Sequence, residues 1–192
     1  LQKIRCDETG LVAMSQNRPE FGRILDPAPV AACLGLKVHD LMPQNILPVQ
    51  VASTGLHKIF VPIRNLNTLM RICPNLTAIE RISRSVGAIG IYCLTLESLD
   101  GGIAQCRNFA PVVGIEEDAA TGTSAAATAC LLYHHGVVDH QRASDLVFEQ
   151  GYAIERPSRI QVRLQVNGPE ITRVWVAGRA RTRNRIEWET TG

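Results

Sequence analysis

The chain has 192 residues, of which 45% are hydrophobic and 20% charged, and its formal net charge is +2 at pH 7. This length can bury a sizeable core, as one large domain or slightly more, and the composition is that of a globular protein. The small net charge and the lack of an apolar run long enough for a membrane span predict neither nucleic-acid nor membrane partners, so we expect a cytoplasmic protein.

The cysteines indicate a reducing environment. The sequence contains six of them, without a C-x-x-C pair, at Cys6, Cys33, Cys73, Cys93, Cys106 and Cys130. They are widely spaced and sit mostly in apolar runs. This pattern predicts buried free thiols rather than a framework of disulfide bonds.

Strand and helix signals alternate along the first half of the chain. Residues 1–14 read as a hairpin that turns near Thr9-Gly10, and residues 17–21 read as irregular. The further expected elements are a short helix at 27–34, strands at 47–52 and 58–63 around Ser53-Thr54-Gly55, and helices at 66–73 and 76–86. Proline at 74 and glycine at 35 and 87 mark helix ends, and Asn75 caps the helix at 76–86.

The second half is expected to contain mostly strands. These lie at 88–96, 103–109, 145–152, 159–166 and 171–183. The strand at 159–166 alternates apolar and polar residues, which is typical of a strand with one solvated face. Asp100-Gly101-Gly102 and Asn167-Gly168 are the turns that join neighbouring strands.

One helix, from Ser124 to His135, is apolar on every side. Residues 119–133 contain no charged side chain, and Gly136 stands where a helix would end in the left-handed conformation. A helix that lacks a polar face is buried, and this one is too short to span a bilayer. We therefore expect it to form the centre of the core.

The start of this helix is the chemically notable end. Thr121, Gly122, Thr123 and Ser124 offer hydroxyls and backbone N–H groups where the helix dipole is positive, which suits a carboxylate or a phosphate. Asp118 lies just upstream and could contact the same ligand. The alternative is that a threonine only caps the helix while Asp118 complements the dipole.

The residues around this helix start carry a family resemblance. Residues 108–111 (N-F-A-P) and 114–125 (G-I-E-E-D-A-A-T-G-T-S-A) resemble the signature of the phenazine-biosynthesis isomerase family (PhzF-like), roughly F-A-P, a short loop, then G-I-x-E-D-P-A-T-G-S-A. Residues 16–25, residues 48–61 and Gly178 also resemble segments of the family, in the order in which the family has them. Ala119 replaces the usual proline and loosens the turn, whereas Thr123 replaces a frequent serine and keeps a hydroxyl.

The resemblance implies an α+β fold of the diaminopimelate-epimerase-like superfamily, in which a curved, mostly antiparallel sheet wraps around a central helix. The family has two such domains with the active site between them. No segment here resembles the family's S-E-T-A-F segment, which carries the catalytic glutamate, or its C-G-H-A-T segment. We therefore expect residues 1–20 to be a remnant of the N-terminal domain, 21–45 a connecting segment and 46–192 the C-terminal domain.

The resemblance also implies a function, namely cofactor-independent isomerisation of a small cyclic amino or hydroxy carboxylate by proton transfer. Gly122, Thr123 and Ser124 would bind the substrate carboxylate, and Asp118 would act as the catalytic residue that orients its amine or hydroxyl. Thr54 and Gly55 are further candidates, because the equivalent turn lies beside the ligand in the superfamily. The glutamate would come from the missing N-terminal domain, residues 1–192 alone would be inactive, and the protein would be a homodimer.

A metal site is a weaker interpretation. His134, His135, Asp139 and His140 are close in sequence, but His134 and His135 point apart on a helix. No ligand set with a recognised spacing completes the group. We expect no metal and no cofactor.

A run of alternating arginines suggests a charged strand face. It comprises Arg179, Arg181, Arg183 and Arg185. A nucleic-acid groove would interleave aromatic side chains, and only Trp175 and Trp188 are near in sequence. A solvated face, or one that contacts another subunit, fits better.

Two rival functions remain to be compared. Epimerases and racemases that share this fold use a cysteine at the tip of the equivalent helix, where a thiolate is stabilised. Here the tip has none, and Cys130 lies about two turns deeper. The alternative from another class is a non-catalytic ligand-binding or interaction module of the same fold.

Overall fold

The structure is a computed structural model that describes residues 3–6 and 10–179. Within them one sheet contains the strands β1 (Ile4–Cys6), β2 (Leu11–Ser15), β3 (Glu20–Ile24), β4 (Gln50–Ser53), β5 (Lys58–Pro62), β6 (Ile91–Thr95), β7 (Ala104–Ala110), β8 (Ile115–Asp118), β9 (Leu146–Gln150), β10 (Ser158–Asn167) and β11 (Glu170–Arg179). The helices are α1 (Pro27–Cys33), α2 (Leu66–Met70), α3 (Leu76–Ser85) and α4 (Gly122–His134), with 3-10 turns at Val38–Asp40, Pro111–Val113 and Tyr152–Ile154.

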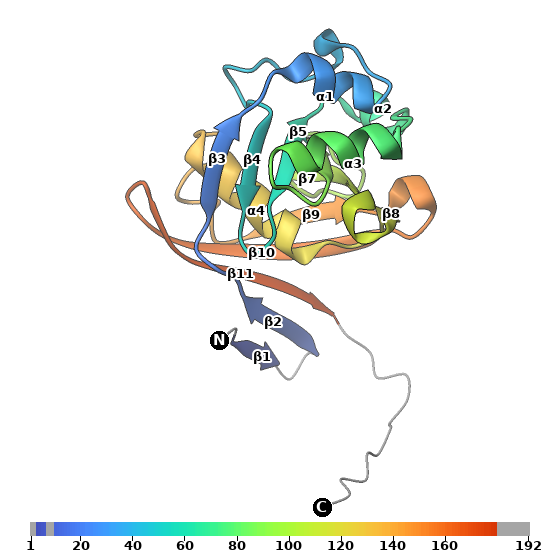
Figure 1. Ribbon diagram of the computed structural model, residues 1–192. Helices are drawn as coiled ribbons and strands as arrows, with labels where there is room; N and C mark the ends of the chain where they lie inside the picture. Colours follow the sequence, from blue (N-terminus) through green and yellow to red (C-terminus); the bar gives the residue numbers. More distant parts are fainter. Residues whose placement is uncertain (1–2, 7–9, 180–192) are drawn as a thin grey trace, which may run out of the picture.

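The sheet is mostly antiparallel and curls around α4. Its strands follow the order β1-β2-β11-β10-β9-β7-β6-β5-β4-β3, and β8 pairs with β7 off this path. The β5–β6 and β7–β9 pairs are parallel, and the other pairs are antiparallel. Helix α4 contacts β10 and β11 on one side and β4 on the other (Figure 1). This is the α+β architecture expected from the sequence.

Side-chain alternation along the strands creates two cores. Phe60 of β5 and Tyr92 of β6 face α4, whereas their neighbours Ile59 and Ile91 face the opposite side of the sheet. Helices α1 and α3 cover that second side (Figure 1). Strands β5 and β6 are therefore buried on both faces, as parallel strands usually are.

The central helix follows the sequence-based expectation. All its residues from Ser124 to Leu132 are buried, and Gly136 adopts a φ of 72° just beyond its end. The small side chains of Ala125, Ala126 and Ala129 are completely inaccessible to solvent, so the sheet packs closely around the helix. In the residues that the structure describes, no helix is long and apolar enough to cross a membrane.

Several boundaries and two strands differ from expectation. Strands β3 and β8 were not expected, because β3 is a largely exposed edge strand and β8 is only four residues long. Helix α2 ends at Met70 rather than 73, and the strand expected at 47–52 begins at Gln50. The expected extension of β11 to 183, with Arg181, Arg183, Arg185 and Trp188, lies outside the described residues.

The cysteines are as expected, with two exceptions. None of the six, all within the described residues, forms a disulfide, and Cys33, Cys93, Cys106 and Cys130 are buried. Cys6 and Cys73 are exposed, which corrects the expectation for these two residues. Cys6 lies on the edge strand β1, and Cys73 follows the end of α2.

Candidate active site

A row of buried polar side chains crosses the sheet on the face that holds α4. It consists of Lys58 on β5, Tyr92 on β6, Asn108 on β7 and Gln150 on β9, each at most 2% exposed. Strand alternation places all four on one face, and the β6–β7 register pairs Tyr92 with Asn108 directly. Buried polar groups are costly unless they are hydrogen-bonded, so this row calls for a structural or functional reason.

Gln150 connects the row to the start of α4. Its side-chain oxygen accepts hydrogen bonds from the Tyr92 hydroxyl at 3.0 Å and from the Thr121 backbone N–H at 3.3 Å. Its side-chain nitrogen donates to the Asp118 carbonyl at 2.7 Å and to the Thr121 hydroxyl at 3.0 Å. The side-chain amide of Gln150 therefore forms hydrogen bonds with both ends of the turn between β8 and α4, at Asp118 and at Thr121.

The same turn is fixed from a second side. The Ser158 hydroxyl on β10 donates to the Ala119 carbonyl at 2.7 Å. Gly151 passes close by with a φ of 84°, and a Cβ atom there would approach the Ala119 carbonyl oxygen to 2.8 Å and the Arg156 carbonyl oxygen to 2.2 Å. Only glycine fits this close approach, so strands β9 and β10 determine the path of the turn.

Asp118 is bound to the turn through its carboxylate. The Thr121 hydroxyl donates to Asp118 Oδ2 at 2.6 Å, and the Ala120 N–H lies 3.5 Å from Oδ1. The carboxylate remains half-buried and therefore reachable. The sequence-based expectation that Asp118 lies at the helix tip agrees with this geometry.

The N-terminus of α4 is open. Thr121 is the N-cap residue, yet its side chain makes no capping hydrogen bond to the helix. The N–H groups of the first helical turn have no intrahelical partner, and the hydroxyls of Thr123 and Ser124 have no hydrogen-bond partner within the described residues. Gly122 and Thr123 are half-buried, whereas Ser124 is 3% exposed. Donors and a positive dipole thus gather beside a carboxylate.

An apolar hollow adjoins this tip. It is lined by Gly122, by Val12 and Met14 of β2, and by Ile160 and Val176 of the long strands. A Cβ atom at Gly122 would come within 3.1 Å of Val176 Cγ2. The missing side chain of this glycine therefore lets the start of α4 lie close against Val176 at the edge of the hollow.

Thr54 and Gly55 stand in different positions. The buried Thr54 hydroxyl donates to the Thr123 carbonyl at 3.0 Å, which ties the β4–β5 turn to α4. Gly55 is exposed, and its N–H donates to the Ser53 hydroxyl at 2.9 Å. Thr54 thus supports the helix tip, and Gly55 forms no hydrogen bond with it in the described part of the chain.

Glu117 points away from the tip. Its carboxylate forms a two-pronged ion pair with Arg107, with Nε–Oε1 at 2.9 Å and Nη2–Oε2 at 2.7 Å. Arg107 Nη1 also donates to backbone carbonyls at the end of α2 and just after it, including that of Ile72 at 3.0 Å. This buried pair anchors β8 on the opposite face of the sheet, so Glu117 is not available to a ligand beside Asp118.

Lys58 was not among the residues expected in the site. Its ammonium donates to Asn108 Oδ1 and is almost fully buried. Burial lowers the pKa of Lys58 to about 8, and the nearby charge of Asp118 partly opposes this shift. The sequence contained a signal, because alternation puts Lys58 on the same face as the inward-facing Phe60.

The rival sites are not supported by this geometry. In the described residues no group of three or more His, Cys, Asp and Glu side chains is placed to hold a metal ion. Cys130 is completely buried within α4, and burial raises the pKa of its thiol to about 12. Such a thiol is out of reach of a ligand, and burial disfavours the thiolate that would act as a base.

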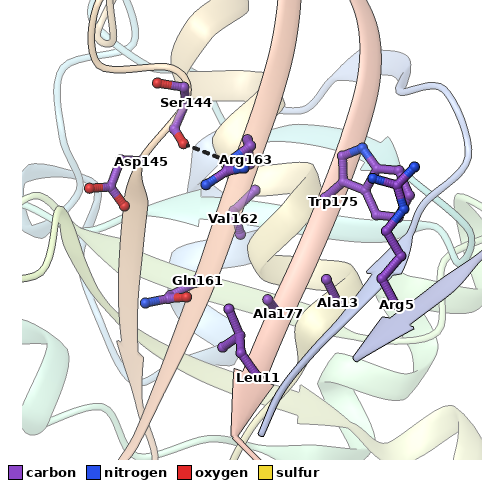
Figure 2. A pocket seen from close by; sticks show the side chains of 10 residues that line it. All are labelled: Arg5, Leu11, Ala13, Ser144, Asp145, Gln161, Val162, Arg163, Trp175 and Ala177. Atoms are coloured by element: carbon purple, nitrogen blue, oxygen red, sulfur yellow. Dashed lines mark hydrogen bonds between the residues drawn. The ribbon is translucent and has the colours of Figure 1, made fainter. Parts of the chain in front are cut away.

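Another hollow lies on the solvated face of β10, β11 and β2, away from α4. Figure 2 shows Arg5 stacked beside Trp175, with 4.9 Å between the guanidinium carbon and the ring centroid, and Arg163 donating to the Ser144 carbonyl. Gln161 and Ala177 form its floor. Among the described residues that line it, no buried polar side chain offers an open donor, so it is a weaker candidate than the α4 tip.

A curved sheet around an uncapped, buried helix defines a protein of the epimerase-like α+β class. The family model described as "Phenazine biosynthesis-like protein" matches residues 3–185, and the chain therefore belongs to this family. A crystal structure of a Bacillus anthracis phenazine biosynthesis protein of the PhzF family superposes with a TM-score of 0.74 at 25% identity, covering 93% of this chain and 61% of that one.

Curated relatives give the same family. An uncharacterized isomerase of Deinococcus radiodurans is 34% identical over 161 residues, covering 83% of this chain and 51% of the relative. The trans-2,3-dihydro-3-hydroxyanthranilate isomerase of Pseudomonas aeruginosa is 28% identical over 166 residues, covering 86% of this chain and 54% of the relative. The chain thus spans about half the length of these relatives, which are named as isomerases.

Proposed function

We propose that the α4 tip binds the carboxylate of a small cyclic amino or hydroxy carboxylate, and that the chain is part of a cofactor-independent isomerase. The observation that carries the proposal is the uncapped N-terminus of α4 next to a carboxylate held by Thr121. Open N–H groups at a helix start bind anions. A carboxylate beside them accepts a hydrogen bond from an amine or a hydroxyl on the same ligand.

The roles follow from these positions. The N–H groups of Gly122, Thr123 and Ser124 hold the ligand carboxylate, and the free hydroxyls of the last two add donors. Asp118 orients the amine or hydroxyl of the ligand. The ring of the ligand lies in the apolar hollow beside Gly122, and Thr54 keeps the tip in place through the Thr123 carbonyl.

The proton-transferring group is proposed to lie outside the matched region. Isomerisation by proton transfer needs a titratable group within hydrogen-bond reach of the moving proton. A glutamate in the part of the relatives that this chain does not span fits that need, and residues 1–192 alone are then inactive. We also expect the complete protein to be a cytoplasmic homodimer.

A turnover assay tests the proposal. The substrate is trans-2,3-dihydro-3-hydroxyanthranilate, and the two proteins are residues 1–192 and a chimera that adds the unmatched part of the P. aeruginosa relative. We expect the chimera to turn the substrate over and residues 1–192 not to. In deuterated water, the product of the chimera should contain deuterium. Full turnover by residues 1–192 contradicts the assignment of the proton transfer to the other part.

The alternative is a binding module without catalysis, and it makes a different prediction. The supporting observation is that Asp118 is already engaged by Thr121 in the free protein. In that case the chimera binds the substrate at the α4 tip without turning it over. The same assay, combined with a binding measurement, therefore separates the two functions.

A further inference from the structure

Lys58 is an unusual residue for a protein core. It is 2% exposed, although lysine is among the residues least often fully buried. An ammonium has three donors, and the described residues supply one acceptor, the Oδ1 atom of Asn108. A side chain chosen only to fill space beside Phe60 would be apolar, because burying an ammonium is costly.

Among the described residues, Asp118 is the charge that compensates Lys58. Asp118 on β8 raises the pKa of Lys58, against the larger lowering by burial. Asn108 accepts the hydrogen bond from the Lys58 ammonium, and it is the β7 residue paired with Asp118 in the β7–β8 ladder. Lys58 thus reaches the α4 tip through a direct neighbour of Asp118 as well as through its charge.

The other titratable side chains of β6 and β7 on the same face as Lys58, Tyr92 and Cys106, stay neutral near pH 8, whereas the charged pair of Arg107 and Glu117 lies on the opposite face. Tyr92 on β6 is completely buried, and burial raises its pKa well above the ordinary value. Burial also raises the pKa of Cys106 on β7 to about 12. Ala52, the β4 residue paired with Lys58, does not titrate. Lys58 and Asp118 are therefore the pair that determines the local charge.

We propose that Lys58 is a positioning residue of the α4 tip, whose buried ammonium orients Asn108, balances Asp118 and sets the charge of the site by its protonation state. With Lys58 protonated, the pair is neutral and the helix N-terminus accepts an anion. When Lys58 loses its proton, Asp118 is uncompensated and repels a carboxylate beside it. This consequence for ligand binding rests on the proposed function, whereas the coupling between the two side chains does not.

The coupling is tested by NMR titration of residues 1–192 between pH 6 and 11. The sequence contains three lysines, Lys3, Lys37 and Lys58, so Cε signals are few and Lys58→Arg assigns the buried one. The expected result is a Cε signal that titrates near pH 8, with the backbone amide signals of Asp118, Thr121 and Gly122 following the same midpoint.

Three variants complete this titration. Lys58→Met abolishes the amide step at the tip, and the matched control Lys37→Met, at an exposed position, retains it. Asp118→Asn keeps Lys58 but removes the opposing charge, so the lysine midpoint falls by about one unit. This second variant decides the matter even if Lys58→Met fails to fold. Tip amides without a step at the lysine midpoint, or a midpoint unchanged in Asp118→Asn, overturn the proposal.

A binding measurement separates this inference from the proposed function. Anthranilate, a stable amino carboxylate, is titrated into the protein at pH 6.5 and pH 9. Its affinity is expected to fall by about three- to tenfold at the higher pH, and Lys58→Met removes the pH dependence. If the tip amides titrate with Lys58 but anthranilate does not bind, the proposed function fails and the coupling stands. Anthranilate binding that is independent of Lys58 and of pH overturns the positioning role.

Discussion

The Thr121 hydroxyl donates to the Asp118 carboxylate at 2.6 Å instead of capping the helix that it begins. Threonine at an N-cap position usually accepts a hydrogen bond from an N–H group of the first turn. Here the contact closes the turn between β8 and α4 and leaves the N–H groups of the helix without a side-chain cap. The Gln150 side-chain nitrogen donates hydrogen bonds to the same two residues, at the Asp118 carbonyl and the Thr121 hydroxyl. The site is thus built as an open helix start beside an anchored acid.

Asp118→Asn separates ligand orientation from a purely structural role. Asparagine can still accept from Thr121, so the loss is mainly the negative charge. A role in the helix dipole alone predicts a stability loss of about 0.3–1 kcal/mol and normal turnover. A role in orienting an amine removes roughly 1.5–3 kcal/mol of binding, and kcat/KM in the catalytically complete chimera should fall about ten- to a hundredfold. We expect the second result, with a nearly unchanged Tm.

Thr123→Val is the matched control for that variant. It removes a hydroxyl that has no partner in the described residues and leaves the local charge unaltered. We expect weaker binding of the carboxylate, by less than in Asp118→Asn, together with little change in Tm. Measuring both variants for Tm and turnover decides the matter. An Asp118→Asn protein that melts earlier but turns over normally would show that Asp118 is only structural.

Gln150→Leu should disrupt the turn and the site together. The substitution keeps the volume but removes the acceptor of Tyr92 and both donors to the turn. The buried Tyr92 hydroxyl is then unsatisfied, which costs about 1–3 kcal/mol. Urea unfolding should report this loss, and anthranilate binding should weaken in parallel. Leu146, on the same face of β9, provides the control Leu146→Met, which should alter stability by less than about 1.5 kcal/mol and leave binding unchanged.

Lys58→Met should change the pH dependence of stability. The pKa of Lys58 is lowered from 10.5 to about 8 in the folded protein, so between these values the unfolded chain binds more protons on this lysine. The stability of the wild type therefore gains up to about 1.4 kcal/mol per pH unit from Lys58 as the pH rises through this window. The variant lacks this gain. Urea unfolding at pH 7, 8.5 and 10 measures this effect. The free energy of unfolding of the wild type should rise with pH relative to that of Lys58→Met.

The Arg107–Glu117 pair should be a strong structural contact. Arg107→Met leaves a largely buried carboxylate unpaired and removes a donor from carbonyls after α2, with an expected cost of about 3–5 kcal/mol. The double variant with Glu117→Leu should be less destabilised than Arg107→Met alone, because no unpaired charge remains. Equal losses in the single and double variants would mean that the charge pair itself contributes little.

The core helix and most strands could be predicted from sequence because their signals are local. The uncharged run around Ala125, the caps at Asn75 and Gly136, and the alternation of β10 are each visible within a dozen residues. The family signature also located Asp118 and Gly122 at one helix tip. The division into a remnant to residue 20, a connecting segment and a domain from residue 46 stays a prediction, although β1 and β2 join the sheet through β11.

The supporting residues of the site could not be predicted in the same way. Gln150 reaches Asp118, 32 positions earlier, because β9 pairs in parallel with β7, and this pairing leaves no local pattern. Alternation puts Lys58 on the same face as Phe60, but a lysine at the start of a strand is more typical of a solvated charge until Asn108 is placed beside it. Strand β8 is held by its pairing with β7 and by the Glu117–Arg107 ion pair rather than by its own propensity. Tertiary pairing, not local preference, assembles these groups.

The most direct test of the account is a crystal structure of the protein with anthranilate. We predict that the ligand carboxylate accepts hydrogen bonds from the N–H groups of Gly122, Thr123 and Ser124, with the amine at Asp118. Loss of this binding in Asp118→Asn would support the same assignment. A ligand seated instead in the hollow beside Trp175 and Arg163, with the α4 tip unliganded, would contradict carboxylate binding at the α4 tip.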